Sequence, residues 1–198
     1  MHLTCNRQIS LSSIRFFSAP FQYFVSREAF DDASSLSILE WLETSAPWRL
    51  VETEFYEQFE FNFSDVRLPH LLSFLQEQSF LDDLRAKVER LFDITLCNRI
   101  DLNAHKLLSG QRIRIHNDFI PGQETHRLLI QLNREWSDEN GGLLIFFNSP
   151  DPADMYSVFR PIHNSMIGFA ISHKSHHAVS TIHNGERYTL VYSFYEKQ

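Results

Sequence analysis

Turn residues recur at regular intervals through the second half of the chain, and this regularity limits the folds that the chain can adopt. From about residue 94 onward, short apolar or alternating runs are separated by turn residues roughly every eight to twelve positions. The runs are 104–108, 111–115, 127–132, 143–148, 156–162, 166–171, 178–182 and 187–194, and the breaks include Ser109-Gly110, Pro121-Gly122, Asn140-Gly141-Gly142 and Asn184-Gly185. Many short strands at this spacing predict an antiparallel structure, either closed or built from two sheets.

The first half of the chain has a mixed pattern. Apolar residues recur at helical intervals over 27–43 and 80–92, a third helix is expected at 69–78, and 16–25 and 48–63 are expected to be extended. Phe59, Phe61 and Phe63 alternate with polar residues, which predicts a strand face in the core. Because no linker separates the halves, we expect a single domain over 1–198, with 1–94 supporting a β-core over 95–198.

Composition excludes several classes of protein. The formal net charge of −7 disfavours nucleic-acid binding, and no apolar stretch approaches the length of a membrane span. The segment 1–18 is polar and contains Arg7 and Arg15, so it does not resemble a signal peptide. Cys5 and Cys97 allow at most one disulfide and fit a reducing compartment. We therefore expect a cytoplasmic protein with neither a membrane nor a nucleic-acid partner.

Histidines gather in the predicted β-core: of the ten in the chain, seven lie at or after His116. In a strand, residues two apart point to the same face, so His116 and Asp118 would present an imidazole and a carboxylate side by side. With one distant histidine they would form a 2-His-1-carboxylate triad, which leaves positions open on Fe(II).

The third ligand is ambiguous from the residues alone. A two-residue turn at Asn184-Gly185 would place His176 on the strand face of Arg187, whereas a three-residue loop that begins at His183 would place His177 there. Both registers remain open at this point. The competing residues are His173, His176, His177 and His183, of which His173 and His183 are expected to lie on the surface near loops.

Several charged and polar neighbours have two interpretations. Arg112 and Arg114 share strand parity with His116, so either one reaches into the pocket or both are solvated. His105 and Lys106 pose the same question on a neighbouring run. The remaining candidates are Arg127, structural or facing a substrate, and the pair Asn133 and Trp136, expected to close a turn.

An ordered set of motifs resembles a known family. The set is His116-Asn117-Asp118, then Arg127 to Leu132-Asn133, then Trp136, Gly141-Gly142, His177-Ala178-Val179 and Arg187. It resembles the Fe(II)- and 2-oxoglutarate-dependent dioxygenases, in particular their small prolyl-4-hydroxylase-like branch, over about residues 102–195. The first half shows a weaker similarity to oxygenases that tailor ribosomal peptides carrying cyclophane cross-links.

The resemblance implies a fold, a site and a reaction. The fold would be a mainly β structure with helices, a double-stranded β-helix (jelly roll) with N-terminal supporting helices. Fe(II) would be held by His116, Asp118 and His177, the last selected by its ten-residue interval to Arg187. Arg187 and Thr189 would bind the distal carboxylate of 2-oxoglutarate, since a guanidinium pairs bidentately with a carboxylate. With O₂, and ascorbate as a candidate reductant, such an enzyme hydroxylates an unactivated carbon and releases succinate and CO₂.

The substrate is expected to be a side chain of a peptide or protein. Three alternatives stand beside this interpretation. The first is an oxygenase of a free amino acid or another small molecule. The second is a cupin-like metal-binding jelly roll that does not use 2-oxoglutarate. The third is a non-catalytic interaction domain that retains the fold.

Overall fold

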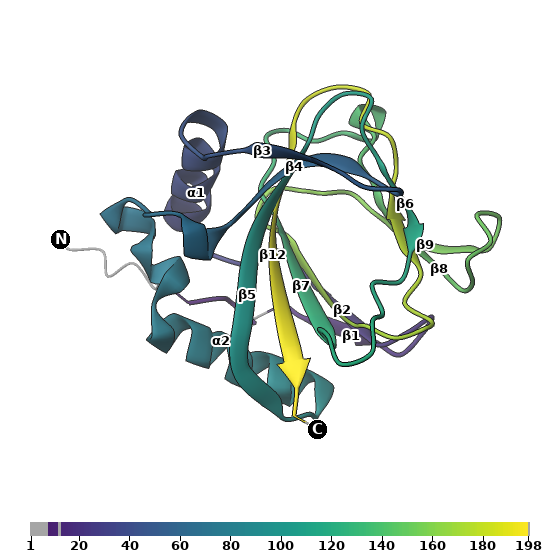
Figure 1. Cartoon of the computed structure of the whole chain (residues 1–198), viewed down its shortest axis with the longest axis horizontal. Coiled ribbons are helices and arrows are strands. Elements are labelled where there is room, and N and C mark those ends of the chain that lie inside the picture. Colours follow the sequence, from purple (N-terminus) through teal and green to yellow (C-terminus); the bar gives the residue numbers. More distant parts are fainter. Residues whose placement is uncertain (1–7, 12, 198) are drawn as a thin grey trace.

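Two antiparallel sheets face each other in the computed structural model, which describes residues 8–11 and 13–197 (Figure 1). The large sheet has the strand order β1-β2-β10-β7-β12-β5-β4-β3, and the small sheet has the order β6-β11-β8-β9. The strands are β1 (Arg15–Phe17), β2 (Tyr23–Ser26), β3 (Arg49–Glu52), β4 (Glu57–Asn62), β5 (Leu96–Leu107), β6 (Ile113–His116), β7 (His126–Gln131), β8 (Leu144–Phe147), β9 (Met155–Phe159), β10 (Met166–Ala170), β11 (His177–Val179) and β12 (Arg187–Glu196).

From β5 onward the chain alternates between the sheets. Strands β5, β7, β10 and β12 belong to the large sheet, and β6, the β8–β9 pair and β11 belong to the small one. This alternation is the jelly-roll arrangement, and the fold class predicted from the sequence is confirmed. Strands from the first half of the chain extend the large sheet at both edges, with β1 and β2 on one side and β3 and β4 on the other.

Helices cover the outer face of the large sheet (Figure 1). They are α1 (Asp32–Thr44), α2 (Gln78–Phe92) and the 3₁₀ segments η1 (Phe63–Asp65) and η2 (His70–Gln76). A further 3₁₀ segment, η3 (Asp138–Asn140), lies in the connection between β7 and β8. Alternation along β12 explains the layering: Leu190 and Tyr192 pack into the core beneath the helices, whereas Val191 belongs to a second core between the sheets. Arg187 and Thr189 have the parity of Val191, so they also face the space between the sheets.

Several predicted boundaries in the first half are wrong. The segment 69–78 is a 3₁₀ helix over His70–Gln76, as is common for short connectors, and α2 begins at Gln78. The first helix begins at Asp32, because Asp31 caps it by accepting a hydrogen bond from the amide of Ser34. The extended segment 48–63 is two strands, since a turn closed by Thr53 separates β3 from β4.

The aromatic alternation over 59–63 is largely as predicted. Phe61 and Phe63 are buried in the core under the helices, and Phe59 is half-buried. Cys97 is a free thiol, whereas Cys5 and the first seven residues of the segment 1–18 lie outside the described residues. No helix within 8–11 and 13–197 is long and apolar enough to cross a membrane.

Candidate functional site

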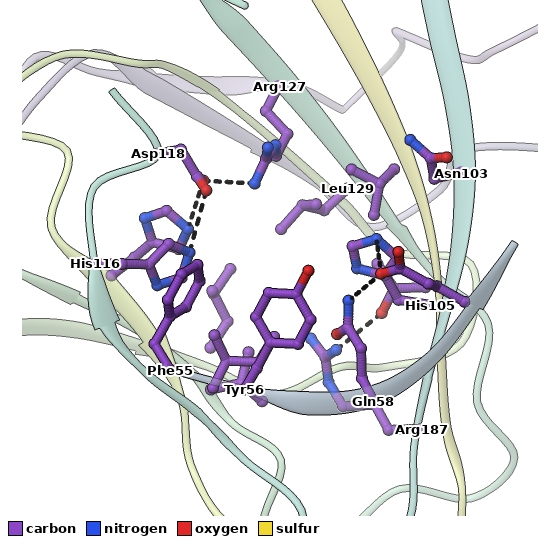
Figure 2. Close-up of a pocket in the computed structure, with 17 residues that line it drawn as sticks. Phe55, Tyr56, Gln58, Asn103, His105, His116, Asp118, Arg127, Leu129 and Arg187 are labelled. Carbon is purple, nitrogen blue, oxygen red and sulfur yellow. Dashed lines mark hydrogen bonds and ion pairs between the residues drawn. The ribbon is translucent and has the colours of Figure 1, made fainter. Parts of the chain in front are cut away.

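A cavity of about 290 Å³ lies between the two sheets (Figure 2). Its walls are the inner faces of β4, β5, β7 and β12 on one side and parts of β6, β8 and β11 on the other. Figure 2 shows His116 and Asp118 at one end of the cavity and Arg187 with His105 and Gln58 at the other. We call these the carboxylate end and the guanidinium end.

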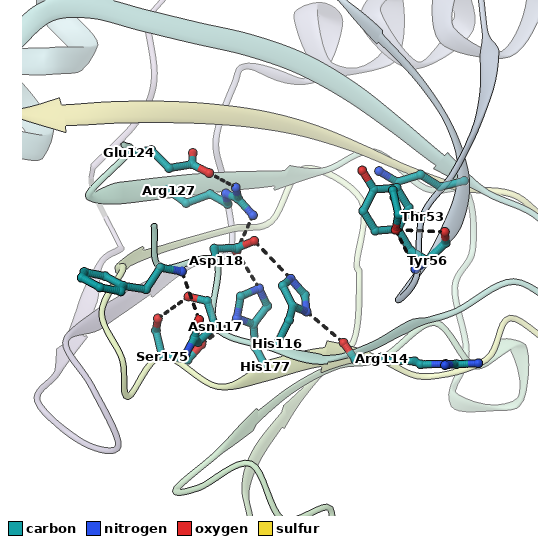
Figure 3. Close-up of polar contacts among 12 residues, drawn as sticks. Thr53, Tyr56, Arg114, His116, Asn117, Asp118, Glu124, Arg127, Ser175 and His177 are labelled. Carbon is teal, nitrogen blue, oxygen red and sulfur yellow. Dashed lines mark hydrogen bonds and ion pairs between the residues drawn. The ribbon is translucent and has the colours of Figure 1, made fainter. Parts of the chain in front are cut away.

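Three of the sequence-predicted residues meet at the carboxylate end (Figure 3). His116 ends β6 and lies directly opposite His177, the first residue of β11. Asp118 lies between them: its Oδ1 is 3.2 Å from Nε2 of His116, and its Oδ2 is 3.1 Å from Nε2 of His177. The three potential ligand atoms all lie within 4.8 Å of one another. This spacing suits a single metal ion.

Hydrogen bonds at the other ring nitrogens fix the orientation of both histidines. Nδ1 of His116 is 2.8 Å from the carbonyl of Arg114, and Nδ1 of His177 is 2.7 Å from the carbonyl of Ser175. A carbonyl only accepts, so each Nδ1 carries the hydrogen. In the neutral imidazole each Nε2 then directs a lone pair toward a carboxylate oxygen of Asp118. Because the two Nε2 lone pairs and the carboxylate oxygens are all acceptors, a cation bound between them would stabilise the arrangement. N and O ligands of this kind suit a divalent metal.

The reason His116 and Asp118 meet differs from the predicted one. β6 ends at His116, and Asp118 lies beyond it with a φ of +59°, so strand parity does not align the pair. Parity also fails before His116, because a bulge sets two residues of β6, Arg114 and Ile115, against one residue of β11, Ala178. Ile113 and His116 therefore both face the cavity, while Arg112 and Arg114 are exposed outside it.

Neither of the hairpin registers considered for the third ligand exists. β11 pairs with β6 and β8 in the small sheet, whereas β12 pairs with β5 and β7 in the large one. The segment between them crosses from one sheet to the other, so it sets no register between a histidine and Arg187. His177 is buried beside Asp118, while His176 is outside the group of three, and His173 and His183 are exposed.

Arg127 on β7 is a site residue whose role the sequence left undecided. Its Nη1 donates to Oδ2 of Asp118, and its Nη2 donates to Oε1 of Glu124. Burial raises the pKa of Asp118, but Arg127 and then His177 lower it more, so the net pKa lies well below the usual value. Asp118 is thus held as an anion between a guanidinium and two imidazoles. No local pattern reveals this contact, which depends on how the loop 117–125 folds back over β7.

Arg187 at the guanidinium end is in a contrasting state. It is 3% exposed, and Nη1 donates to Oγ1 of Thr189 at 2.9 Å. Nε and Nη2 are buried without a hydrogen-bond partner among the described residues, and burial lowers the pKa of Arg187 to about 10. The hydroxyl of Thr189 donates to Oε1 of Gln131 at 3.0 Å, so Thr189 holds Arg187 in place. Two unpaired N–H groups on one guanidinium fit a carboxylate.

The other predicted residues lie at the edges of this site. A Cβ at Gly142, where φ is +63°, would lie 3.0 Å from Cδ of Arg187, so the glycine leaves room for the arginine. Nearby, Nε1 of Trp136 donates to the carbonyl of Gly141. Asn133 is buried and links the carbonyl of Pro161 to the amide of Tyr188. The Trp136 contact closes a local turn, as predicted, whereas the turn-closing role predicted for Asn133 is wrong, because its side chain joins segments that are distant in sequence.

Comparisons with known proteins bear on this geometry. Residues 102–195 match the family model of the 2OG-Fe(II) oxygenase superfamily. No curated protein sequence matches the chain. Solved structures do match the chain. Their sequence identity to it is low, so the match shows a shared fold.

Three of these structures illustrate the likeness. A Pseudomonas putida prolyl-4-hydroxylase has a TM-score of 0.71 at 16% identity, with 89% of this chain and 93% of that chain covered. A Trichoplax adhaerens prolyl hydroxylase, in complex with a peptide fragment of the hypoxia inducible factor oxygen degradation domain, has a TM-score of 0.69 at 14% identity, with 88% and 83% covered. A viral collagen prolyl hydroxylase from Paramecium Bursaria Chlorella virus-1, in its 2OG complex, has a TM-score of 0.61 at 14% identity, with 88% and 96% covered.

Proposed function

We propose that this chain is a 2OG-Fe(II) oxygenase, as the family model that matches residues 102–195 supports, and that it hydroxylates a carbon of a peptide substrate. His116, Asp118 and His177 bind Fe(II), and Arg187, held by Thr189, binds the distal carboxylate of 2-oxoglutarate. One oxygen atom of O₂ enters the C–H bond of the substrate, and the other enters the succinate formed as 2-oxoglutarate loses CO₂. Atoms and electrons balance without a further reductant, and ascorbate would serve only to keep the iron reduced.

One observation carries the proposal: two incomplete polar groups face each other across one cavity. At the carboxylate end, two Nε2 lone pairs face a carboxylate at 3.1–3.2 Å. At the guanidinium end, a buried arginine has two unpaired N–H groups. A metal ion complements the first group and a carboxylate the second, and 2-oxoglutarate is a dicarboxylate that can join the two.

The residues of this chain supply binding, orientation and exclusion of water. Bound Fe(II) and 2-oxoglutarate supply the oxidising power, because three protein ligands leave positions open for the co-substrate and O₂. Arg127 fixes the carboxylate of Asp118 by donating to Oδ2, the oxygen that also faces His177. Apolar lining residues, including Leu129, Leu144 and Val179, keep the space between the two ends dry.

A peptide substrate is the finer part of the proposal. The Trichoplax adhaerens enzyme of the same fold is described with a peptide bound. The cavity here is flanked by a second hollow lined by Phe55 and Tyr56 together with exposed residues such as Arg112 and Arg114. That hollow offers room for residues on either side of the one that reacts. We place the reaction in the cytoplasm, where Fe(II) and the free thiol of Cys97 both persist.

Succinate formation tests the proposal. Purified protein with Fe(II), 2-oxoglutarate, ascorbate and O₂ should form succinate, faster with a peptide that is a substrate. Asp118→Ala should form none, and Asp65→Ala, an exposed carboxylate control, should match the wild type. Equal succinate formation by Asp118→Ala would contradict the proposed metal ligands. Metal binding without 2-oxoglutarate binding would instead identify a cupin-like jelly roll.

A further inference from the structure

A polar wall of the cavity has no role in the function proposed above. It consists of Gln58 and Glu60 on β4 with Asn103 and His105 on β5, and all four line the cavity. The strand register places Glu60 opposite His105, and His105 opposite Thr189. The wall therefore continues the large sheet beyond the guanidinium end, with Tyr56 between it and the carboxylate end (Figure 2). We call these four residues the β4–β5 wall.

The β4–β5 wall presents hydrogen-bond acceptors. Nε2 of Gln58 donates to Oε2 of Glu60 at 2.8 Å, so the amide oxygen of Gln58 is left over. Gln58 is 1% exposed, and this Oε1 has no partner among the described residues. His105 does not neutralise Glu60: their nearest atoms are 3.9 Å apart, and burial, Arg127 and Arg187 lower the pKa of His105 to about 3. The amide oxygen of Gln58 thus faces the cavity without a donor, beside a carboxylate whose one side-chain hydrogen bond among the described residues comes from a neutral amide.

The charges of the loaded site leave Glu60 uncompensated. The metal dication, Arg127 and Arg187 together balance the 2-oxoglutarate dianion, Asp118 and Glu124, so Glu60 adds a negative charge that none of these groups offsets. Lys106, which follows His105 in sequence, lies on the other face of β5, over the rings of Trp48 and Phe59. Among the described residues, only His105 comes within ion-pair distance of Glu60. A mostly buried carboxylate without a cation attracts a cationic ligand.

We infer that the β4–β5 wall binds the cationic end of a lysine or arginine side chain, so that the enzyme modifies a basic residue of a peptide. The inference rests on the proposed function and names its substrate class. An ammonium or guanidinium supplies the donor that Oε1 of Gln58 lacks and a positive charge beside the carboxylate of Glu60. Its methylene stem then crosses the cavity toward the carboxylate end, past the aromatic rings of Phe55 and Tyr56. The net charge of −7 favours approach of a basic peptide.

A peptide panel tests the inference. Nine-residue peptides of glycine, alanine and serine carry one central arginine, lysine, glutamine, methionine, proline or glutamate. Calorimetry measures their binding to protein loaded with Fe(II) and 2-oxoglutarate without O₂, and mass spectrometry detects a gain of one oxygen after O₂ is admitted. The arginine or lysine peptide should bind at least about tenfold more tightly than the glutamine and methionine peptides, since a charged hydrogen bond adds about 1.5–3 kcal/mol.

Two matched glutamate variants locate the effect. Glu60→Gln should remove the preference for a cationic peptide. Glu40→Gln should keep it, because Glu40 is exposed on α1 and lines neither the cavity nor the second hollow. Equal binding of cationic and neutral peptides by the wild type would overturn the inference, as would a preference that survives in Glu60→Gln. The wild-type panel decides the question even if Glu60→Gln does not fold.

The same samples separate this inference from the proposed function. If the wild type binds 2-oxoglutarate and forms succinate but shows no cationic preference, only the inference about the β4–β5 wall fails. If it binds no 2-oxoglutarate, the proposed function fails as well.

Discussion

Each end of the cavity holds one arginine, largely buried at the carboxylate end and fully buried at the guanidinium end, and the two guanidinium groups are in opposite electrostatic states. Arg127, at the carboxylate end, is paired with Asp118 and Glu124. Burial lowers its pKa, but these two carboxylates raise it more. Arg187, at the guanidinium end, touches no carboxylate of residues 8–11 and 13–197, and burial alone lowers its pKa.

This difference separates a residue that completes the folded protein from one that awaits a ligand. A buried cation with two anionic partners is satisfied in the folded chain. A buried cation with a single hydroxyl partner retains the cost of leaving water until an anion arrives. This contrast predicts that removal of the two arginines changes the free energy of unfolding in opposite directions. Further predictions concern the proposed metal ligands and Thr189, which holds Arg187.

The largest expected effect is loss of the metal. His177→Ala should abolish tight Fe(II) binding, because one of three proposed ligands is missing. His176→Ala is the matched control, since His176 is adjacent in sequence but lies outside the group. Anaerobic calorimetry of Fe(II) binding measures both. Metal loss in His176→Ala with retention in His177→Ala would reverse the assignment.

Removal of the satisfied arginine should destabilise the protein. Arg127→Met leaves Asp118 and Glu124 as buried, unpaired charges, which should lower the free energy of unfolding of the metal-free protein by about 3–5 kcal/mol. Arg134→Met, which breaks an exposed pair with Glu43, should cost less than about 1 kcal/mol. Urea unfolding compares the two. A similar small cost for both would remove the distinction drawn for Arg127.

Removal of the arginine without an anionic partner, Arg187, should instead raise the free energy of unfolding. Arg187→Met replaces an uncompensated buried charge by an apolar side chain of similar length. The metal-free protein should become more stable by about 1–3 kcal/mol in the same urea experiment. A loss of more than about 1 kcal/mol would indicate that the folded chain already satisfies Arg187.

The smallest effect is expected at Thr189. Thr189→Val removes the acceptor that holds Nη1 of Arg187, which should cost about 1 kcal/mol, or roughly fivefold in affinity for 2-oxoglutarate. Thr189→Ser keeps the hydroxyl and should bind as the wild type does. The measurement is an anaerobic titration of metal-loaded protein. If the serine variant lost as much affinity as the valine variant, the methyl group would matter and the hydroxyl would not.

The sequence predicts the strand-rich half of this fold well because its signals there are local. Turn residues and short apolar runs depend on neighbours in the chain, so all eight predicted runs overlap strands. The β5 strand was predicted too short, since its first half, from Leu96, is exposed or polar at many positions and gains its partners from β12.

The site is less accessible to local reasoning. Strand parity predicted that the side chains of His116 and Asp118 meet. They do meet, but a bulge in β6 and the positive φ of Asp118 bring them together, not the alternation of a regular strand. No hairpin register could choose between His176 and His177, because β11 and β12 lie in different sheets. Arg127 illustrates the limit most clearly: its two carboxylate partners precede it in sequence by nine and three residues, and only the fold of the intervening loop brings them to it.

The proposed role of Arg187 is to bind the distal carboxylate of 2-oxoglutarate, and a comparison of two ligands tests it. Metal-loaded wild type and Arg187→Ala are each titrated without O₂ with 2-oxoglutarate and with 2-oxobutyrate, which lacks that carboxylate. Loss of a buried charged partner costs about 2–5 kcal/mol, so Arg187→Ala should bind 2-oxoglutarate about 30-fold to several thousand-fold more weakly. Its affinity for 2-oxobutyrate should be unchanged, and Arg187→Lys should recover part of the loss. If Arg187→Ala binds 2-oxoglutarate as tightly as the wild type, the guanidinium end does not anchor the co-substrate and the account is contradicted.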